Sequence, residues 1–312
     1  MSSLWRTSIV RRLLLSSGIV AGALLVASGC GGGSPRGPAD LVIVSTRDGD
    51  YALFGMGADG GRERRLTHER GDPATASGLY FQIEPAWSPD GGRIAFASGR
   101  TGGLAIYVML ADGTGTRRLT AGKQDDMHPA WSPDGKRIAF VRNFDGKVEV
   151  MNADGTGVHR LTDAEGAETD PAWSPDGRWI VYSGRAPATA VRELWLARPD
   201  GSDRHRLTSL GKVSTSPAWS PDGGRIAFDR RTGGGREAIF IVGADGKGLR
   251  PLTRASDQEQ IEPAWSPDGK TISFSLDGAI ALSDLEGNVT TLTDPRHNDS
   301  SPAWNPRPAK PE

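Results

Sequence analysis

The tripeptide Pro-Ala-Trp occurs six times in this 312-residue chain, and this recurrence constrains the fold more than any local propensity. Five copies continue as Pro-Ala-Trp-Ser-Pro-Asp-Gly, and successive copies lie 39 to 46 residues apart. The tryptophans are Trp87, Trp131, Trp173, Trp219, Trp265 and Trp304. Self-similarity at such a period marks supersecondary units that stack, because one unit cannot bury its apolar face alone. The chain is therefore expected to be an array of repeated units.

Each repeat has the pattern of four short strands joined by tight turns. In the unit that begins at Pro129, Pro-Ala-Trp leads through Ser-Pro-Asp-Gly to strands expected over 137–142, 147–152 and 158–162. Ser-Pro-Asp-Gly suits a type I turn, since proline presets φ at its second position and glycine suits its fourth. An Asp-Gly pair before the last strand is a hairpin signal. The pattern predicts an all-β fold of four-stranded antiparallel sheets.

The two ends of the repeat region complement each other. The chain enters at 41–46 with a second strand that has no Pro-Ala-Trp strand before it, and 302–304 is a first strand without a successor. A six-bladed β-propeller whose first blade is closed by the C-terminal strand explains both fragments and leaves no open edge between the first and last blades. We predict one propeller domain over 40–305, followed by a Pro-rich tail over 306–312.

Residues 1–29 have the layout of a secretory signal. An apolar run over 13–26 is shorter than the roughly 20 residues that a spanning helix needs. Three arginines precede it, at Arg6, Arg11 and Arg12. We therefore expect a cleaved signal peptide over 1–29 and an exported protein.

Cys30 is the only cysteine of the chain and directly follows the small residues at 27–29. This junction resembles the lipobox of bacterial lipoproteins, in which the cysteine is acylated and becomes the new amino terminus. An ordinary signal peptide with an incidental cysteine is the alternative. The glycine- and proline-rich segment 30–39 cannot bury a core and is expected to be a flexible linker. We predict a protein anchored through Cys30 to the periplasmic or extracytoplasmic face of a bacterial membrane.

The charge of the chain argues against nucleic-acid binding. The formal net charge is −1, and without the three arginines of the signal it is −4. Nucleic-acid binding by bulk charge needs clustered positive potential. The sequence therefore predicts no nucleic-acid partner.

The Pro-Ala-Trp-Ser-Pro-Asp-Gly, Ile-Ala-Phe and Arg-Leu-Thr signatures resemble the TolB-type propeller repeat, and they cover about 41–304. The resemblance implies a propeller that binds other cell-envelope proteins. The same family includes propellers attached to peptidases and propellers that act as lyases. The last repeat departs from the pattern, with Asn305-Pro306-Arg307 in place of Ser-Pro-Asp-Gly, which fits a terminal strand that needs no turn into a successor.

The repeated side chains have a structural and a functional interpretation. Six tryptophans at one phase resemble a binding stack, but packing between neighbouring blades is the favoured explanation. The repeated aspartates could be cation ligands, although an aspartate in a turn commonly accepts hydrogen bonds from its own backbone. The aspartates are Asp90, Asp134, Asp176, Asp222 and Asp268.

The Ser-Pro-Asp-Gly and Asp-Gly turns fall on one face of a propeller, which we call the turn face. The opposite loop face carries the blade-to-blade connections and the loops between second and third strands. Its longest loop, 68–84, contains Tyr80 and Phe81. Variable loops on a rigid scaffold commonly carry binding residues, and aromatic residues there can anchor a partner. The alternative is that both rings fold over the mouth of the channel as a plug.

The residues that precede each Pro-Ala are expected to approach the propeller axis. They are Glu84, His128, Asp170, Ser216, Glu262 and Ser301. Second strands end near the arginines Arg47, Arg100, Arg142, Arg185 and Arg230. We predict that acids and arginines alternate in a ring of ion pairs that ties the blades together. The functional alternative is a polar funnel that accepts a peptide or small ligand.

A search for catalytic motifs finds no Gly-x-Ser-x-Gly, His-Glu-x-x-His or phosphate-binding glycine loop. Three histidines fall on the loop face, at His68, His128 and His297. The family resemblance to oligogalacturonate lyases, which hold a metal through histidines on a propeller, keeps a metal site of these three as an alternative. They do not have a diagnostic spacing.

The favoured hypothesis is a non-enzymatic, monomeric binding module without a cofactor, anchored in the cell envelope. Its partner is expected to be an envelope protein or peptide, with a glycan as a further possibility. The expected binding residues are Tyr80, Phe81, Glu84, His128, Asp170, Glu262, Arg100, Arg142 and Arg185. A metal-dependent polysaccharide lyase and a sensor with a small ligand in the axial funnel are the alternatives.

Overall fold

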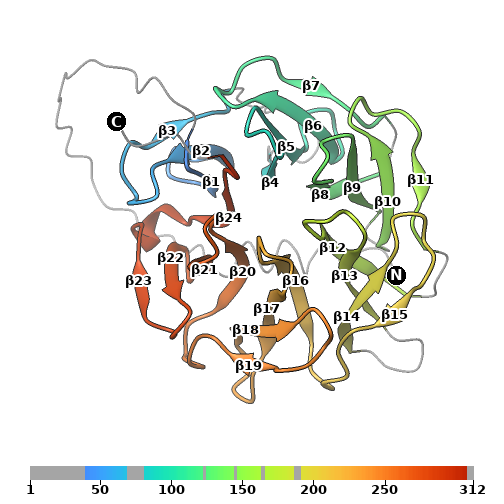
Figure 1. Cartoon of the computed structure of the whole chain (residues 1–312). Helices are drawn as coiled ribbons and strands as arrows, with labels where there is room; N and C mark the ends of the chain where they lie inside the picture. The colour runs from blue at the N-terminus through green and yellow to red at the C-terminus, as the bar shows by residue number, and fades with distance from the viewer. Residues whose placement is uncertain are drawn as a thin grey trace.

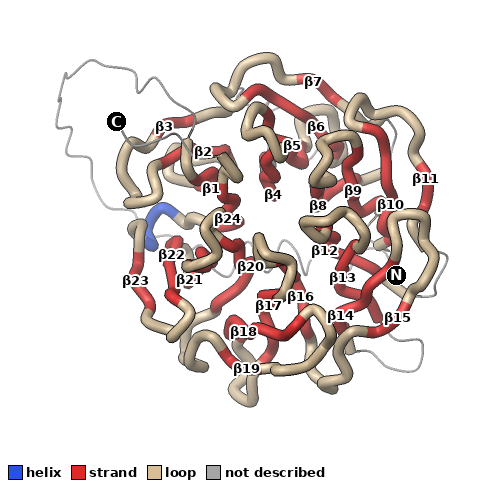
Figure 2. Tube along the Cα trace, viewed as in Figure 1, coloured by secondary structure: helices blue, strands red, loops and turns tan. Residues whose placement is uncertain are grey.

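The computed structural model describes residues 39–68, 81–121, 124–143, 146–162, 166–185 and 191–307. Within these ranges, 24 strands form six four-stranded sheets arranged as blades around a central axis (Figure 1). The prediction of an all-β six-bladed propeller is confirmed. The one short helix in these ranges, η1 (Pro295–His297), joins blade 6 to blade 1 (Figure 2). None of the helical structure in the same ranges has the length and apolar character needed to cross a bilayer.

Blades 1 to 3 contain the following strands, from the axis outward. Blade 1 has β24 (Ser300–Trp304), β1 (Leu41–Ser45), β2 (Ala52–Met56) and β3 (Arg64–Arg65). Blade 2 has β4 (Gln82–Trp87), β5 (Arg93–Ser98), β6 (Ala105–Leu110) and β7 (Arg117–Arg118). Blade 3 has β8 (Asp126–Trp131), β9 (Arg137–Arg142), β10 (Lys147–Asn152) and β11 (His159–Arg160).

Blades 4 to 6 repeat this order. Blade 4 has β12 (Glu168–Trp173), β13 (Ile180–Arg185), β14 (Arg192–Ala197) and β15 (His205–Arg206). Blade 5 has β16 (Ser214–Trp219), β17 (Arg225–Arg231), β18 (Glu237–Gly243) and β19 (Arg250–Pro251). Blade 6 has β20 (Gln260–Trp265), β21 (Thr271–Leu276), β22 (Ala279–Asp284) and β23 (Val289–Thr291).

The C-terminal strand closes the ring of blades. β24 pairs antiparallel with β1, with Leu41 opposite Trp304, so the predicted completion of blade 1 is confirmed. The amide of Asn305 donates to the carbonyl of Asp40 at 2.8 Å, and its side-chain Nδ2 donates to the carbonyl of Ala39 at 3.1 Å. Asn305 therefore ties the end of the last repeat to the start of the first. The Ser-Pro-Asp-Gly turn of the other repeats is not needed at this position, because no second strand of the same blade follows it.

The outermost strands are shorter than the sequence predicts. The strand expected over 158–162 spans only His159–Arg160. In the other five blades a threonine side chain takes over the role of the backbone at the end of the ladder. Blade 2 shows the arrangement: the Oγ1 of Thr120 accepts the amide of Ile106 at 3.0 Å, and the amide of Leu119 donates to the carbonyl of Ile106. The threonine of the Leu-Thr pair thus replaces a backbone partner and ends the strand.

The turn aspartates bind their own turns, as the favoured explanation predicts. Oδ1 of Asp90 accepts the amide of Gly92 at 3.0 Å and the hydroxyl of Ser88 at 2.5 Å. The same pair of contacts recurs at Asp134, Asp176, Asp222 and Asp268. These carboxylates are structural acceptors and not a set of cation ligands.

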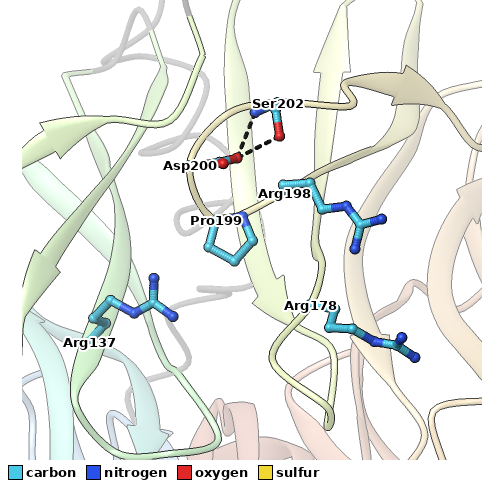
Figure 3. Close-up of a pocket in the computed structure, with 6 residues that line it drawn as sticks. All are labelled: Arg137, Arg178, Arg198, Pro199, Asp200 and Ser202. Carbon is cyan, nitrogen blue, oxygen red and sulfur yellow. Dashed lines mark hydrogen bonds between the residues drawn. The ribbon is translucent and has the colours of Figure 1, made fainter.

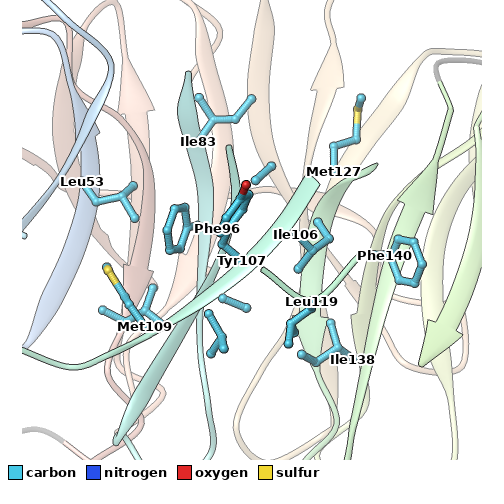
Figure 4. Close-up of a cluster of buried hydrophobic side chains, with 14 of the residues drawn as sticks. Leu53, Ile83, Phe96, Ile106, Tyr107, Met109, Leu119, Met127, Ile138 and Phe140 are labelled. Atoms are coloured by element: carbon cyan, nitrogen blue, oxygen red, sulfur yellow. The ribbon is translucent and has the colours of Figure 1, made fainter. Parts of the chain in front are cut away.

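The repeated tryptophans pack between neighbouring blades. Four of them are only 7–8% exposed, namely Trp87, Trp131, Trp173 and Trp265. The indole of Trp87 donates to the carbonyl of Ala303 at 3.1 Å, across the boundary between blades 2 and 1. Figure 4 shows the aliphatic and aromatic side chains that fill one such core around Phe96, Ile106 and Leu119. The core-packing interpretation of the tryptophans is confirmed.

The Asp-Gly turns also hold neighbouring blades together. Gly201 adopts a φ of +85°, and a Cβ built there would lie 2.1 Å from the carbonyl oxygen of Leu161 in the preceding blade. Gly113 has a φ of +93° and would place a Cβ 2.3 Å from the carbonyl oxygen of Leu66. Only glycine satisfies both the left-handed backbone and the close approach between blades.

Candidate functional site

The innermost strand of every blade is interrupted at the same position by one residue in the left-handed conformation. Each of these residues has a φ between 50° and 58° and precedes a proline, and the strand pairing shifts register there. Proline has no amide for the ladder, so the bulge occurs where the pairing is already broken. We call these six partly exposed residues the axial ring: Glu84, His128, Asp170, Ser216, Glu262 and Ser301.

Carboxylates of the axial ring bind backbone amides of the next blade. The amide of His128 donates to Glu84 at 2.6 Å, and the amide of Ser301 donates to Glu262 at 2.8 Å. The amide of Ser216 lies 3.4 Å from Asp170. Acids from blades 2, 4 and 6 therefore tie three pairs of blades, which explains why they alternate with residues that are not acidic.

His128 bridges two acids of the ring. Its Nε2 lies 3.3 Å from Glu84 Oε1, and its Nδ1 lies 2.8 Å from Asp170 Oδ1. Burial acts to lower the pKa of His128, but attraction to Glu84 and Asp170 outweighs burial and raises the pKa to about 9. His128 is therefore an imidazolium at neutral pH, and it donates from both ring nitrogens.

The pKa values of the two acids beside His128 are shifted in opposite directions. Burial raises the pKa of Glu84 despite the attraction to His128. Burial also opposes ionisation of Asp170, but the charge and hydrogen bond of His128 outweigh it and lower the pKa of Asp170. This side of the ring therefore places one imidazolium between two carboxyl groups whose pKa values are shifted in opposite directions.

The opposite side of the ring is acidic. Glu262 accepts the hydroxyls of Ser275 at 3.0 Å and Ser301 at 3.1 Å, and among the described residues it forms no ion pair. Its amide donates to Asp229 at 3.1 Å. Burial raises the pKa of Glu262, and the negative charge of Asp229 acts in the same direction. The axial ring is therefore asymmetric, because Glu262 has a raised pKa and no ion pair among the described residues, whereas Glu84 and Asp170 contact His128.

The predicted alternation of acids and arginines is wrong. Glu84 and Asp170 pair with His128, while Arg142 pairs within its own blade with Asp126 at 3.0 Å and Glu149 at 2.7 Å. The other second-strand arginines stack on third-strand rings, with Arg100 4.6 Å from the centroid of Tyr107 and Arg230 5.0 Å from that of Phe240. Arg185 ends β13. Side chains alternate along a strand, so these arginines lie between blades and not at the axis.

Of the two aromatic residues predicted to anchor a partner, Tyr80 lies outside the described residues. Phe81 packs on Tyr51 of blade 1, with ring centroids 5.1 Å apart. Both rings are partly buried, and burial raises the pKa of Tyr51. Tyr51 was not identified from the sequence, because its loop follows a strand with no unusual pattern. Cys30, the predicted lipidation site, also lies outside the described residues.

The three histidines considered for a metal are not brought together. His68 follows the outermost strand of blade 1, whereas His128 lies on the innermost strand of blade 3 and His297 on η1. Across the described ranges, no group of three or more histidine, cysteine, aspartate or glutamate side chains is arranged to hold a metal ion. The alternative of a site built from these histidines is therefore wrong.

A shallow cavity of about 420 Å³ lies on the turn face between blades 3 and 4. Its arginines are engaged by neighbours: Arg178 pairs with Asp176 at 2.7 Å, and Arg198 pairs with Asp203 at 3.0 Å. Figure 3 shows Arg137 on one side of the turn at Asp200 and the other two guanidinium groups on the opposite side. Arg137 stacks on Trp173, so two of the three arginines of this cavity are paired with carboxylates and the third packs on an indole.

Comparison with known proteins agrees with this architecture. Residues 74–186 match the family described as the TolB beta propeller domain. The structure of TolB from Acinetobacter baumannii superposes with a TM-score of 0.72 at 22% identity, over 88% of this chain and 68% of that one. The chain is a six-bladed β-propeller, and its residues 74–186 match the TolB beta propeller family.

Two further proteins resemble this chain. An uncharacterised protein of Agrobacterium fabrum is 35% identical over 89 residues, which are 28% of this chain and 27% of that relative. The match thus spans about a quarter of that relative's length. An oligogalacturonate lyase in complex with manganese superposes with a TM-score of 0.55 at 13% identity, over 80% of this chain and 73% of the lyase. At this identity the likeness concerns the fold alone.

Proposed function

We propose that the protein is a lipid-anchored cell-envelope propeller that binds another protein, or a peptide segment of one, through its loop face and the adjoining axial ring. The observation that carries the proposal is the contrast between the two faces. On the turn face Asp90 accepts hydrogen bonds from its own turn and Arg178 pairs with Asp176, whereas Glu262 in the axial ring forms no ion pair among the described residues. A partly exposed carboxyl group without an ion pair is available to a partner.

The position of the chain ends supports an anchored arrangement. Leu41 begins β1 opposite Met56, beside the turn-face hairpin that leads to β3, so the chain enters the fold on the turn face. A lipid at Cys30 would be nine residues before Ala39, and an extended chain spans at most about 3.3–3.6 Å per residue. A short tether of this kind favours an orientation with the turn face toward the membrane and the loop face free for a partner.

A binding role is favoured over catalysis by how the ring acids are used. Glu84 and Asp170 hold amides of the next blade and the imidazolium of His128, so they serve as structural acceptors. A general acid or base instead needs a carboxyl or imidazole free to exchange its proton with a substrate.

The binding proposal is tested by capture of partners from detergent-solubilised envelope with the purified full chain. In Glu262→Gln the amide oxygen still accepts from Ser301, but the ionisable carboxyl group is lost. We expect about tenfold weaker capture, which corresponds to about 1.4 kcal/mol. The matched control is Asp268→Asn, on the turn face of the same blade, which should capture the same proteins as the unaltered chain. Equal capture by both variants would contradict the proposal.

The anchor is tested separately with Cys30→Ser. If Cys30 is acylated, this variant should leave the membrane fraction or keep an uncleaved signal, whereas the unaltered protein sediments with membranes and gains the mass of its acyl chains. Mass spectrometry of the N-terminal peptide and membrane fractionation provide the readouts. An unmodified cysteine in the mature, membrane-associated protein would refute lipid anchoring.

A further inference from the structure

The outer part of blades 1 to 4 follows a side-chain pattern that blades 5 and 6 break. A third-strand residue stands opposite a fourth-strand residue, and in blades 1 to 4 the fourth-strand residue is arginine. The pairs are Phe54 with Arg65, Tyr107 with Arg118, Glu149 with Arg160, Trp195 with Arg206, Phe240 with Pro251, and Ala281 with Thr291. In blade 5, proline therefore replaces the arginine beside an aromatic ring.

This replacement coincides with an apolar pocket of about 480 Å³, which we call the blade-5 pocket. Phe240, Ala238, Pro251 and Leu252 supply its apolar lining, and Thr232 and Arg254 also line it. In blade 1 the corresponding space is occupied by Arg65, whose guanidinium lies 6.0 Å from the centroid of Phe54. The shorter proline leaves the ring of Phe240 partly exposed.

The arginines beside the blade-5 pocket lack the carboxylates that their counterparts have. Arg47 pairs with Asp299 at 3.0 Å, and Arg142 pairs with Glu149 at 2.7 Å. By strand register Arg230 is the blade-5 counterpart of Arg142, and it stacks on Phe240. Its buried Nε has no hydrogen-bond partner, and within the described ranges neither Arg230 nor Arg254 forms an ion pair. The apolar pocket is thus accompanied by two positive charges without a carboxylate partner in those ranges.

The pocket opens on the loop face. Thr232 follows β17 in the connection to β18, and Arg254 follows β19 in the connection to blade 6. Pro251 has no amide, so the exposed edge of β19 cannot donate a hydrogen bond to an added strand at that position. A partner is therefore better accommodated by inserting a side chain than by extending the sheet.

We propose that the blade-5 pocket binds an apolar side chain, aromatic or leucine, from a peptide segment of a protein partner in which an acidic residue is adjacent. The apolar side chain packs on Phe240 and Leu252, and the carboxylate pairs with Arg254 or Arg230. Aromatic and apolar anchors in desolvated pockets are the usual centres of binding energy in such interfaces. The inference rests on the proposed function, because it names where on the loop face a partner is held.

The test is a random-peptide phage selection on the purified full chain, followed by affinity measurement of the selected peptides. We expect the selected peptides to share an apolar residue beside aspartate or glutamate. Pro251→Arg restores the residue of blades 1 to 4, fills the pocket with a side chain the repeat accommodates, and should weaken these peptides at least tenfold. Thr291→Arg places the same side chain at the same repeat position of blade 6 and should leave their affinity unchanged.

Arg254→Glu gives a readout that does not depend on refilling the pocket, since this side chain is exposed and its loss leaves the core intact. The same selection on this variant should exchange the acidic neighbour for lysine or arginine. Selected peptides without the apolar-acidic pair, equal affinity for Pro251→Arg, or recovery of only detergent or fatty acid in the pocket would each overturn the inference.

The two proposals fail in different ways. If the unaltered chain captures no envelope protein, the proposed function fails. If the unaltered chain and Pro251→Arg capture the same protein with equal affinity, partner binding stands and the assignment of the blade-5 pocket is wrong.

Discussion

The residue that organises the axial ring is His128. Its imidazolium joins acids from blades 2 and 4, and the left-handed backbone at each ring position costs roughly 1–2 kcal/mol. The amide-to-carboxylate bonds between blades offset that cost, because they satisfy buried donors and link elements distant in sequence. The ring is thus a structural clamp that also sets the charge of the channel.

The charge of His128 predicts a dependence of stability on pH. Its pKa in the folded protein is raised to about 9, against about 6.5 when unfolded. Its contribution is complete below about pH 6.5 and is lost as the pH rises through about 9. We expect the free energy of unfolding to fall by up to about 3 kcal/mol between pH 7 and 10, and this fall to be absent in His128→Gln.

Urea denaturation at a series of pH values measures this effect. The exposed His205→Gln variant is the control and should keep the slope of the unaltered chain. Parallel slopes for the unaltered chain and His128→Gln would show that the imidazolium does not hold the two acids together.

At the scale of elements, the Asp-Gly hairpin turns form contacts between neighbouring blades. Gly201 combines a positive φ with a close approach to Leu161, whereas Gly235 has a φ of +84° and a Cβ added there would meet no atom within 4 Å. Gly235→Ala should therefore show only the backbone penalty of about 1–2 kcal/mol. Gly201→Ala should be destabilised by more than that, since the alanine methyl also displaces a neighbouring blade. Equal melting temperatures for the two variants would contradict the packing role of the turn.

The elements were predictable from the sequence to the extent that the repeat encodes them. The Pro-Ala-Trp strands, the aspartate turns and the closure by β24 follow from patterns that recur along the chain. The shortness of the fourth strands was not predicted from the sequence. It depends on a threonine hydroxyl that replaces a backbone acceptor only once the hairpin has formed.

The candidate site was predictable only in part, because it depends on contacts between units. The phase of the repeat brought Glu84, His128 and Asp170 to the axis, but their partners lie 42 to 44 residues away in neighbouring blades. Arg142 pairs with Asp126 of its own blade. This pairing within a blade replaces the predicted alternation of acids and arginines around the axis. The roles of Tyr51 and Pro251 depend on the residues that they contact, Phe81 and Phe240, which lie elsewhere in the sequence.

At the scale of the whole molecule, the six blades separate two faces with different structures. Both ends of the propeller lie on the turn face, where Asn305 ties to Ala39, and the loop face carries Phe81, the connections around the channel and the blade-5 pocket. We therefore expect a protein partner to bind the loop face while the turn face is directed to the membrane.

Photo-crosslinking in intact cells tests this assignment of the two faces. A photoreactive amino acid is placed at Thr232 on the loop face or at Lys270 on the turn face, both in surface connections. We predict that the chain altered at position 232 forms a discrete covalent adduct with an envelope protein and that the chain altered at position 270 does not. An adduct formed only from position 270 would contradict the assignment, because the partner would then occupy the face that we expect to be directed to the membrane.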